Sequence, residues 1–402
     1  MKLLVLSNGH GEDAIAIRII ERLLEDTPNL DIAALPIVGQ GYAYKKLGIP
    51  LAGRVQQMPS GGFIYKGGNP LWQDLRDGLV RLTLEQVKIV RQWGKTGGKV
   101  LAVGDIVPLL YAWRSKADYA FVGTAKSDYY LRDEFGWLTQ TSSLERKLDS
   151  VYMPWERWLM SSDRCKAIFP RDSLTTEILQ RWEIPAYDLG NPMMDGMTTK
   201  TTAREKDRLE ILLLPGSRMP EAVHNWQQIL SGVWWTIKAL PQMQLEFKAA
   251  IAPGLDLKPF VVHAVTQGWH VTSRQPETIV LNNTRTLTLT REHNHDFFHR
   301  ADLAIAMAGT ATEQFVGLGK PVIIFPGIGP QFTAAFAEAQ SRLLGCSVVM
   351  IENPAKAGTA IAELIKDERL LEQIAINGKR RMGEAGAAKR IARCLQKTLL
   401  YA

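Results

Sequence analysis

The stretch "LLLPGSRMPEA" (212–222) places a turn of small residues directly after an apolar strand. Gly216 allows a ligand or another backbone to approach closely, and Ser217 can cap the helix that follows. Arg218 carries a planar guanidinium that can donate two parallel hydrogen bonds to a phosphate. The turn is therefore either a phosphate-binding loop or an ordinary strand-to-helix connection with a surface arginine, and its spacing favours neither.

A second turn, in "LAIAMAGTATEQFVG", joins a predicted strand to a predicted helix through Gly309, Thr310, Ala311 and Thr312. Backbone N–H groups and the dipole at a helix N-terminus suit a diphosphate. Glu313 falls in the first helical turn, where a carboxylate can accept both hydroxyls of a ribose. In the alternative, Thr310 or Thr312 caps the helix and Glu313 completes the capping arrangement.

Two further turns carry groups that can move protons. Asp105 in "LAVGDIVPLL" follows a predicted strand and can act as a general base, although its spacing alone favours a helix N-cap. The stretch "SNGHGEDA" places Gly9, His10, Gly11 and Glu12 after the first strand. This spacing is not GxGxxG, which disfavours a nicotinamide enzyme. His10 can bind a substrate oxygen, but a lone loop histidine is more often structural or solvated.

The segment 61–95 combines apolar residues at helical spacing with basic residues: Trp72, Leu75, Leu79, Leu82, Arg76, Arg81, Lys88 and Arg91. One interpretation is an amphipathic helix packed on the core with a solvated basic face. The other is a patch that contacts a membrane surface or a lipid acceptor. Trp155 and Trp158 would reinforce the second interpretation if they lie nearby. Elsewhere, His293 and His295 lack partner ligands, so no metal site is expected.

Short apolar strands alternate with amphipathic helices along the whole chain. In the first half, strands are predicted within residues 2–7, 30–39, 99–104 and 119–124. In the second half, strands with their following turns are predicted within residues 209–216, 245–254, 302–309 and 321–327. This alternation predicts parallel sheets covered by helices on both faces. A composition break near 190–208 divides the chain. We therefore expect two facing, Rossmann-like, doubly wound α/β domains, at 1–188 and 189–384. A terminal helix at 385–402 is expected to cross back to the first domain.

Ligands of such sheets bind beyond the carboxyl ends of the strands, where the strand order reverses. The expected site is therefore the cleft between the two domains. All the turns named above follow predicted strands. The domain organisation thus brings their side chains to the same edges of the two sheets.

The composition is that of a globular protein, with 402 residues of which 46% are hydrophobic. No window of about 20 uninterrupted apolar residues appears, and the first residues do not resemble a signal peptide. Three cysteines, far apart in the sequence, fit a reducing compartment, so we expect a cytoplasmic protein. The net charge of +7 is not concentrated in one patch, which argues against a nucleic-acid partner.

Three phrases, "LGNPMMD" (189–195), "LLPGSRMPE" (213–221) and "MAGTATEQ" (307–314), resemble in order and spacing the motifs of the lipid-A-disaccharide synthase family. That family consists of glycosyltransferases with the two-domain GT-B fold. The chain departs from the family pattern in its N-terminal phrase "SNGHGEDA". Asp105 matches an acidic position of the family, but a second aspartate and an asparagine nearby are absent. The resemblance implies that the N-terminal domain (1–188) binds the acceptor and that the C-terminal domain (189–384) binds the nucleotide-sugar donor. These departures therefore concern the acceptor half and leave the donor half less affected.

The resemblance implies an inverting transfer from a UDP-sugar, UDP-N-acetylglucosamine-like or UDP-hexose, to a hydroxyl of a lipid or other amphipathic acceptor. By position, Gly216, Ser217, Arg218 and the 309–312 turn would bind the diphosphate and Glu313 the ribose. Gln331 would meet the donor sugar. Asp105 would act as the base, with His10 as a second catalytic candidate and Gly9, Gly11 and Glu12 in the acceptor loop.

The resemblance further implies that neither a metal nor another cofactor takes part, and it suits an enzyme at the inner face of a membrane. Two alternatives remain open. One is an isomerase similar to UDP-N-acetylglucosamine 2-epimerases, which share the fold and the diphosphate-binding logic. The other is a catalytically silent nucleotide-sugar-binding protein.

Overall fold

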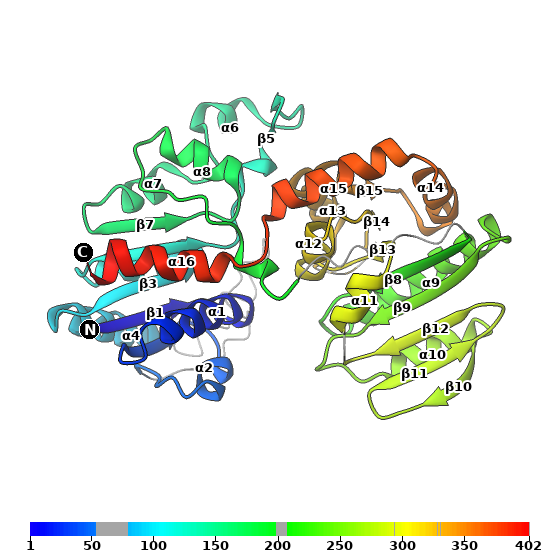
Figure 1. Ribbon diagram of the computed structural model, residues 1–402, viewed down its shortest axis with the longest axis horizontal. Helices are drawn as coiled ribbons and strands as arrows, with labels where there is room; N and C mark the ends of the chain where they lie inside the picture. Colours follow the sequence, from blue (N-terminus) through cyan, green and yellow to red (C-terminus); the bar gives the residue numbers. More distant parts are fainter. Residues whose placement is uncertain (54–78, 198–206, 293, 328, 330, 402) are drawn as a thin grey trace. The chain divides into compact units, whose positions relative to one another are not determined.

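The chain folds into two compact units in the computed structural model, which describes residues 1–401 except 54–78, 198–206, 293, 328 and 330 (Figure 1). Unit 1 comprises Met1–Gly196 together with Glu384–Ala402, and unit 2 comprises Met197–Gly383. The polypeptide thus enters unit 2 at Met197 and leaves it at Gly383. Residues 189–196 therefore belong to unit 1, and not to the second domain as the expected boundary at 188/189 implied.

Unit 1 is built on a five-stranded parallel sheet with the order β2-β1-β3-β4-β7. The strands are β1 (Lys2–Ser7), β2 (Asp31–Pro36), β3 (Lys99–Gly104), β4 (Tyr119–Gly123) and β7 (Cys165–Phe169). Their side chains are buried on both faces of the sheet, as in parallel sheets covered by helices. The strand order reverses between β1 and β3, so the carboxyl ends of these two strands form the switch point of unit 1.

Helices cover both faces of this sheet. One face packs against α1 (His10–Asp26), α2 (Tyr42–Lys46) and α16 (Ala387–Leu395), which continues as the turn Gln396–Leu400. The other face packs against α4 (Leu79–Lys95), α5 (Ile106–Arg114), α7 (Pro154–Met160) and α8 (Ser173–Gln180). The smaller elements are η1 (Asp128–Tyr130), α6 (Ser143–Leu148), η2 (Pro192–Met194) and the hairpin β5 (Arg132–Asp133) with β6 (Gly136–Trp137).

The terminal helix returns to unit 1, as the sequence predicts, and lies beside α1 (Figure 1). Ile391, Leu395 and Leu399 recur at helical spacing and are buried in the same core as Ile15 and Ile19 of α1. The helix is amphipathic with a fully buried apolar face, so its packing against unit 1 follows from hydrophobic burial.

The phrase "LGNPMMD" ties α1 to α16 within unit 1. Arg18 of α1 donates to two carbonyl oxygens of η2, at 2.6 and 3.1 Å. The Asp195 carboxylate accepts hydrogen bonds from the amides of residues 386–388, at 2.7, 2.9 and 2.8 Å. The N-cap residue of α16, Gly386, makes no side-chain capping bond, and Asp195 supplies that bond from a distant part of the chain.

Unit 2 contains an eight-stranded sheet with the order β10-β11-β12-β9-β8-β13-β14-β15. The strands are β8 (Arg208–Leu214), β9 (Gln244–Ala250), β10 (His270–Arg274), β11 (Thr278–Asn282), β12 (Thr286–Thr290), β13 (Leu303–Ala306), β14 (Val322–Ile324) and β15 (Val348–Met350). From β12 to β15 all neighbours are parallel, and β10 and β11 add an antiparallel edge. Here the switch point lies between β8 and β13.

The helices of unit 2 are α9 (Glu221–Ala239), α10 (Lys258–Thr266), α11 (Asn294–Arg300), α12 (Thr310–Gly317), α13 (Ala334–Leu344), α14 (Ala357–Leu364) and α15 (Glu368–Met382), with short turns η3 (Gly345–Ser347) and η4 (Pro354–Lys356). Both units are therefore doubly wound α/β structures, in agreement with the predicted fold class. None of the helices that the structure describes has the length and apolar sequence needed to cross a bilayer.

Candidate functional site

The two motif loops of unit 2 meet at its switch point, because they follow the paired parallel strands β8 and β13. Asn225 of α9 is buried, and its Nδ2 donates to the carbonyl oxygens of Pro215 (3.1 Å) and Met307 (3.3 Å). Gly216 has φ +100°, and a Cβ at this position would lie 3.2 Å from the Met307 oxygen. The positive φ therefore favours a glycine there, and any Cβ would lie in tight contact with the Met307 oxygen. The sequence places these loops 91 residues apart, and the structure brings them together.

A third loop, which follows β14, is fastened to the start of α9. Glu221 is 5% exposed, and its carboxylate accepts hydrogen bonds from the amides of Gln331 (3.0 and 3.2 Å) and Phe332 (2.7 Å). A Cβ on Gly329 would lie 2.4 Å from the Glu221 side chain, so a glycine allows the loop to approach. Gln331 thus lies at the same edge as the two motif loops, and the contact of its side chain with a sugar stays a prediction.

The helix α12 begins directly in the second motif. Its N-cap residue is Gly309, so neither Thr310 nor Thr312 occupies the capping position. The Thr312 hydroxyl instead donates to the carbonyl oxygen of Ala308, at 2.6 Å. Glu313 is half-buried in the first turn, where a negative charge is favoured by the helix dipole. The N-terminus of α12 therefore carries no side-chain cap from either threonine.

Ser217 and Arg218 are exposed in the loop before α9. Pro220 is the N-cap residue of α9, so the expected capping role of Ser217 is wrong. The Arg218 carbonyl oxygen accepts the amide of Ala222 at 2.9 Å, which fixes its backbone at the beginning of the helix. Arg218 is therefore an exposed residue at the carboxyl edge of the sheet, and its contact with a diphosphate stays a prediction.

The switch point of unit 1 gathers acidic side chains. Asp105 is the N-cap residue of α5, and its Oδ1 accepts the amide of Val107 at 2.9 Å. Its Oδ2 accepts Nδ2 of Asn8 at 3.2 Å, which orients the carboxylate. The capping interpretation of Asp105 is thus confirmed, and its role as a base stays a prediction. Burial raises the pKa of Asp105, and the hydrogen bond from Val107 lowers it.

Glu12 lies in the first turn of α1, beside the end of β3. Gly104 has φ +137°, and a Cβ on it would be 3.3 Å from Cγ of Glu12 and 3.5 Å from Cβ of Asn8. Burial raises the pKa of Glu12, and the negative charge of Asp105 raises it further. Two neighbouring carboxyl groups with raised pKa values at a strand edge are typical of sites that transfer protons.

Basic and backbone groups complete this edge of unit 1. Lys126, which follows β4, forms an ion pair with the buried Glu156. Its Nζ also donates to the carbonyl oxygen of Val151, at 3.4 Å. Its positive charge lowers the pKa of Asp105, and the negative charge of Glu156 raises that pKa. The backbone of His10 begins α1, but its side chain lies outside the described part of the structure. Its catalytic role therefore stays a prediction.

Sequence reasoning missed the polar residues that hold these loops. Asn8 follows β1 directly in "LSNG", which is the signal that could have identified it. Asn225 lies one turn after Glu221 on the buried side of α9, where a polar residue among apolar ones indicates a buried hydrogen-bonding role. Asp105, the partner of Asn8, and Met307, one of the two partners of Asn225, are far away in the sequence, so no local pattern reveals these contacts.

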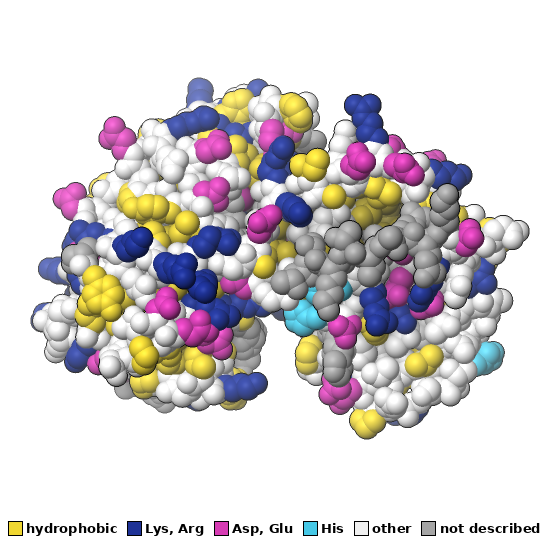
Figure 2. All heavy atoms as spheres, viewed as in Figure 1, with side chains coloured by type: hydrophobic (Ala, Val, Ile, Leu, Met, Phe, Trp, Pro, Cys, Tyr) yellow, Lys and Arg dark blue, Asp and Glu magenta, His cyan; other side chains and the backbone are white. Residues whose placement is uncertain are grey.

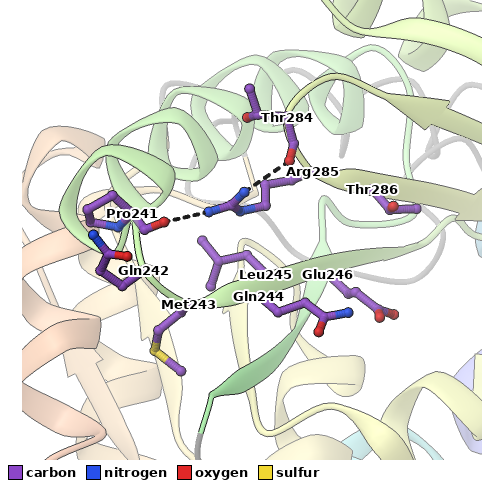
Figure 3. Close-up of a pocket in the computed structure, with 9 residues that line it drawn as sticks. All are labelled: Pro241, Gln242, Met243, Gln244, Leu245, Glu246, Thr284, Arg285 and Thr286. Atoms are coloured by element: carbon purple, nitrogen blue, oxygen red, sulfur yellow. Dashed lines mark hydrogen bonds between the residues drawn. The ribbon is translucent and has the colours of Figure 1, made fainter.

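A separate hollow of unit 2 lies at the other edge of its sheet. It is lined by residues 241–246 and 284–286, where β9 and β12 begin (Figure 3). Arg285 crosses it and donates to the oxygens of Pro241 (2.9 Å) and Thr284 (3.0 Å). This is the amino edge of the strands, where ligands of doubly wound sheets do not ordinarily bind. The motif loops at the carboxyl edge are therefore the better candidate site.

No protein-family model matches the chain. A segment of 217 residues is 26% identical to lipid-A-disaccharide synthase of Trichlorobacter lovleyi. The match covers 49% of this chain and 50% of that relative, so this chain matches about half the length of its curated relative. This chain is thus similar to that enzyme over one half of its length, as the three sequence phrases predict.

Solved structures share the fold over nearly the whole chain. A UDP-N-acetylglucosamine 2-epimerase homologue from Listeria monocytogenes superimposes with a TM-score of 0.58 at 13% identity, covering 100% of this chain and 97% of that one. MurG of Acinetobacter baumannii gives a TM-score of 0.56 at 14% identity, covering 98% and 99%. The chain therefore has the GT-B fold of two Rossmann-like domains, which glycosyltransferases and epimerases both use.

Proposed function

We propose that the chain is an inverting glycosyltransferase that transfers a sugar from a UDP-sugar to a hydroxyl of a lipid or other amphipathic acceptor. One observation carries the proposal: the loops 215–218 and 307–313 meet at the switch point of unit 2 through Asn225, and Glu221 binds the amides of Gln331 and Phe332 at the same edge. These two loops contain phrases that resemble lipid-A-disaccharide synthase. The donor is UDP-N-acetylglucosamine-like or a UDP-hexose.

The donor half stabilises the leaving group. As the bond between the anomeric carbon and the diphosphate oxygen breaks, negative charge grows on UDP. Arg218 and the N-terminus of α12 present positive charge and N–H groups to such an anion. Glu313 accepts the ribose hydroxyls in this proposal. These groups can act in a fixed arrangement, which is what makes electrostatic stabilisation effective.

The acceptor half removes a proton. The acceptor hydroxyl attacks the anomeric carbon from the side opposite the diphosphate, and its proton passes to a carboxylate, so the configuration inverts. Asp105 takes this role, with Asn8 and the α5 amide fixing its orientation. Glu12 is a second carboxylate beside it. The products are the glycoside and UDP, and the base is regenerated when it loses the proton to solvent.

Calorimetric binding of UDP tests the donor site. Arg218→Ala and Glu313→Ala should each weaken UDP binding about 10- to 100-fold, because each removes charge-assisted hydrogen bonds worth about 1.5–3 kcal/mol. Matched controls are Arg274→Ala and Glu363→Ala, which remove exposed residues on β10 and α14 of the same unit. Unchanged UDP affinity in both site variants would remove the site assignment.

Incubation with UDP-N-acetylglucosamine alone separates the transferase from the isomerase alternative. A transferase leaves the configuration of the sugar in the donor unchanged when no acceptor is present. Formation of the 2-epimer without acceptor would contradict the proposal. UDP binding without turnover on any lipid extract would instead indicate a silent nucleotide-sugar-binding protein. The cytoplasmic location stays a prediction from the sequence.

A further inference from the structure

Three helices of unit 1 form one layer with a common outer surface. α4 contacts α5, and α5 contacts α7. Val90, Leu109 and Leu159, one from each helix, point into the same core beneath the sheet. The outer surface of this layer therefore lies on the opposite face of the sheet from α1 and α16. We name it the α4–α5–α7 surface.

The α4 part of this surface is a basic stripe. Among its described side chains, the exposed ones recur at i, i+4, i+7, i+8 and i+11, and they are Leu84, Lys88, Arg91, Gln92 and Lys95. The residues of the opposite stripe, Leu82, Gln86 and Val90, are buried. Since helix residues at this spacing share one face, the described part of α4 presents one leucine, one glutamine and three cations outward. This described part of the predicted segment 61–95 is amphipathic, and residues 61–78 lie outside the described residues.

The α5 and α7 parts add large apolar side chains. Leu110 and Arg114 are exposed on α5, four residues apart. Trp155 and Trp158 on α7 are each 61% exposed. The ring of Trp158 lies 5.1 Å from that of Trp113 of α5, which joins the two helices at the surface. The two tryptophans therefore lie in the same layer as the basic stripe.

Negative charge is missing from the exposed positions of this surface. Within the described side chains of the three helices, the acidic residues are Glu85, which is half-buried, and Glu156, which is buried against Lys126. Exposed tryptophans prefer the interface between lipid and water, and clustered Lys and Arg residues are attracted to anionic headgroups. The combination matches the chemistry of an anionic bilayer surface better than that of an acidic peptide, which would leave two tryptophans in water.

We propose that the α4–α5–α7 surface docks unit 1 onto an anionic lipid bilayer. Trp155 and Trp158 insert at headgroup level, and Lys88, Arg91 and Arg114 contact the headgroups. The inference deepens the proposed function, since a lipid acceptor would be reached from the bilayer. Docking itself requires neither donor nor turnover, so it can succeed or fail independently of the transferase activity.

Sedimentation of the full-length chain with lipid vesicles tests the docking. The wild type should bind vesicles of phosphatidylcholine mixed with phosphatidylglycerol, bind phosphatidylcholine alone much less, and lose binding as salt rises. Trp155→Ser/Trp158→Ser should lower the partition coefficient on anionic vesicles about tenfold or more. Lys88→Glu/Arg91→Glu should lower it by at least as much, at about 1 kcal/mol or fivefold for each lost cation.

Two control variants match these changes elsewhere on the molecule. Trp234→Ser removes a tryptophan of α9 that is 53% exposed in unit 2. Lys389→Glu/Arg393→Glu reverses two exposed cations on α16, which covers the opposite face of the sheet from the α4–α5–α7 surface. Figure 2 shows Lys and Arg side chains along α16. Both controls should keep wild-type partitioning. Circular dichroism and thermal melting check that every variant is folded, independently of UDP binding.

Three outcomes would overturn the proposal: no binding of the wild type to anionic vesicles, equal losses in the site and control variants, or full binding by both site variants. Self-association that disappears in Trp155→Ser/Trp158→Ser, without any vesicle binding, would assign the surface to a second copy of the chain. Loss of vesicle binding with intact UDP binding would support the docking. Loss of UDP binding with intact docking would count against the donor site alone.

Discussion

Removing the Asp195 carboxylate should release the terminal helix from unit 1. Asp195 accepts three amides at the beginning of α16, at 2.7, 2.9 and 2.8 Å, and Gly386 cannot replace it because it has no side chain. In Asp195→Ala these amides lose their partner, and the charge that favours the helix N-terminus is lost as well.

The expected loss follows from the geometry. Loss of an N-cap costs about 0.5–2 kcal/mol, and the present cap is at the upper end because one charged group serves three donors. Water can reach the half-buried site in the variant, so the three bonds do not add in full. We expect the free energy of unfolding of unit 1 to fall by about 2 kcal/mol, which lowers its Tm by about 4–8 °C for a unit of this size. Asp195→Asn keeps one acceptor oxygen and should lose about half as much.

Scanning calorimetry measures the transition, and limited proteolysis reports whether residues 384–402 detach first. Asp188→Ala is the matched control, because Asp188 is an exposed carboxylate a few residues upstream. The reasoning would be refuted if Asp195→Ala melted like the Asp188→Ala control and resisted the protease equally. A loss of stability in both variants would indicate a general charge effect and not a helix cap.

Two predictions concern protons. Asp105→Asn should lower kcat/KM about 10²- to 10⁴-fold while UDP affinity changes little, because it removes the proposed base. Glu12→Gln should move the acid limb of the pH profile of kcat/KM to lower pH, since it removes a negative charge beside Asp105. If Asp105→Asn kept its turnover and Glu12→Gln lost it, Glu12 and not Asp105 would be the base. Burial raises the pKa of Asp128 to about 7. The protonated form of Asp128 is therefore favoured in the folded state. Its contribution to the free energy of unfolding falls by up to about 4 kcal/mol as pH rises from about 4 to 7, and it stays level above pH 7. Asp128→Asn should remove this slope in urea unfolding at pH 5 and pH 8; an unchanged difference between the two pH values would contradict the assignment.

The fold class could be read from the sequence because its signals are local. Apolar strands and amphipathic helices repeat with their own periods, and the face of the terminal helix formed by Ile391, Leu395 and Leu399 is visible in the sequence alone. The edge hairpin of unit 2, β10–β11, was not predicted. All five residues of β10 are exposed, so the strand lacks the apolar alternation that identifies strands.

The candidate site was predicted in part. The motifs located the strand ends, and the N-cap reading of Asp105 is confirmed, because a cap is defined by its immediate neighbours. Ser217 was misassigned as a cap, since the helix begins later, after Pro220. Asn225 and Asn8 could not be assigned roles. Met307, one of the two partners of Asn225, lies 82 residues away, and the partner of Asn8 lies 97 residues away, so only the strand order brings these groups together.

The discontinuous composition of unit 1 has a consequence for synthesis on the ribosome. The core of unit 1 contains Ile391, Leu395 and Leu399 of α16, which emerge only after unit 2 has been translated. Unit 2 is contiguous and can fold while its neighbour still waits for its last helix. Until then, the nascent chain exposes the apolar groove beside α1 that α16 later fills. Unit 1, which begins first, therefore finishes folding last.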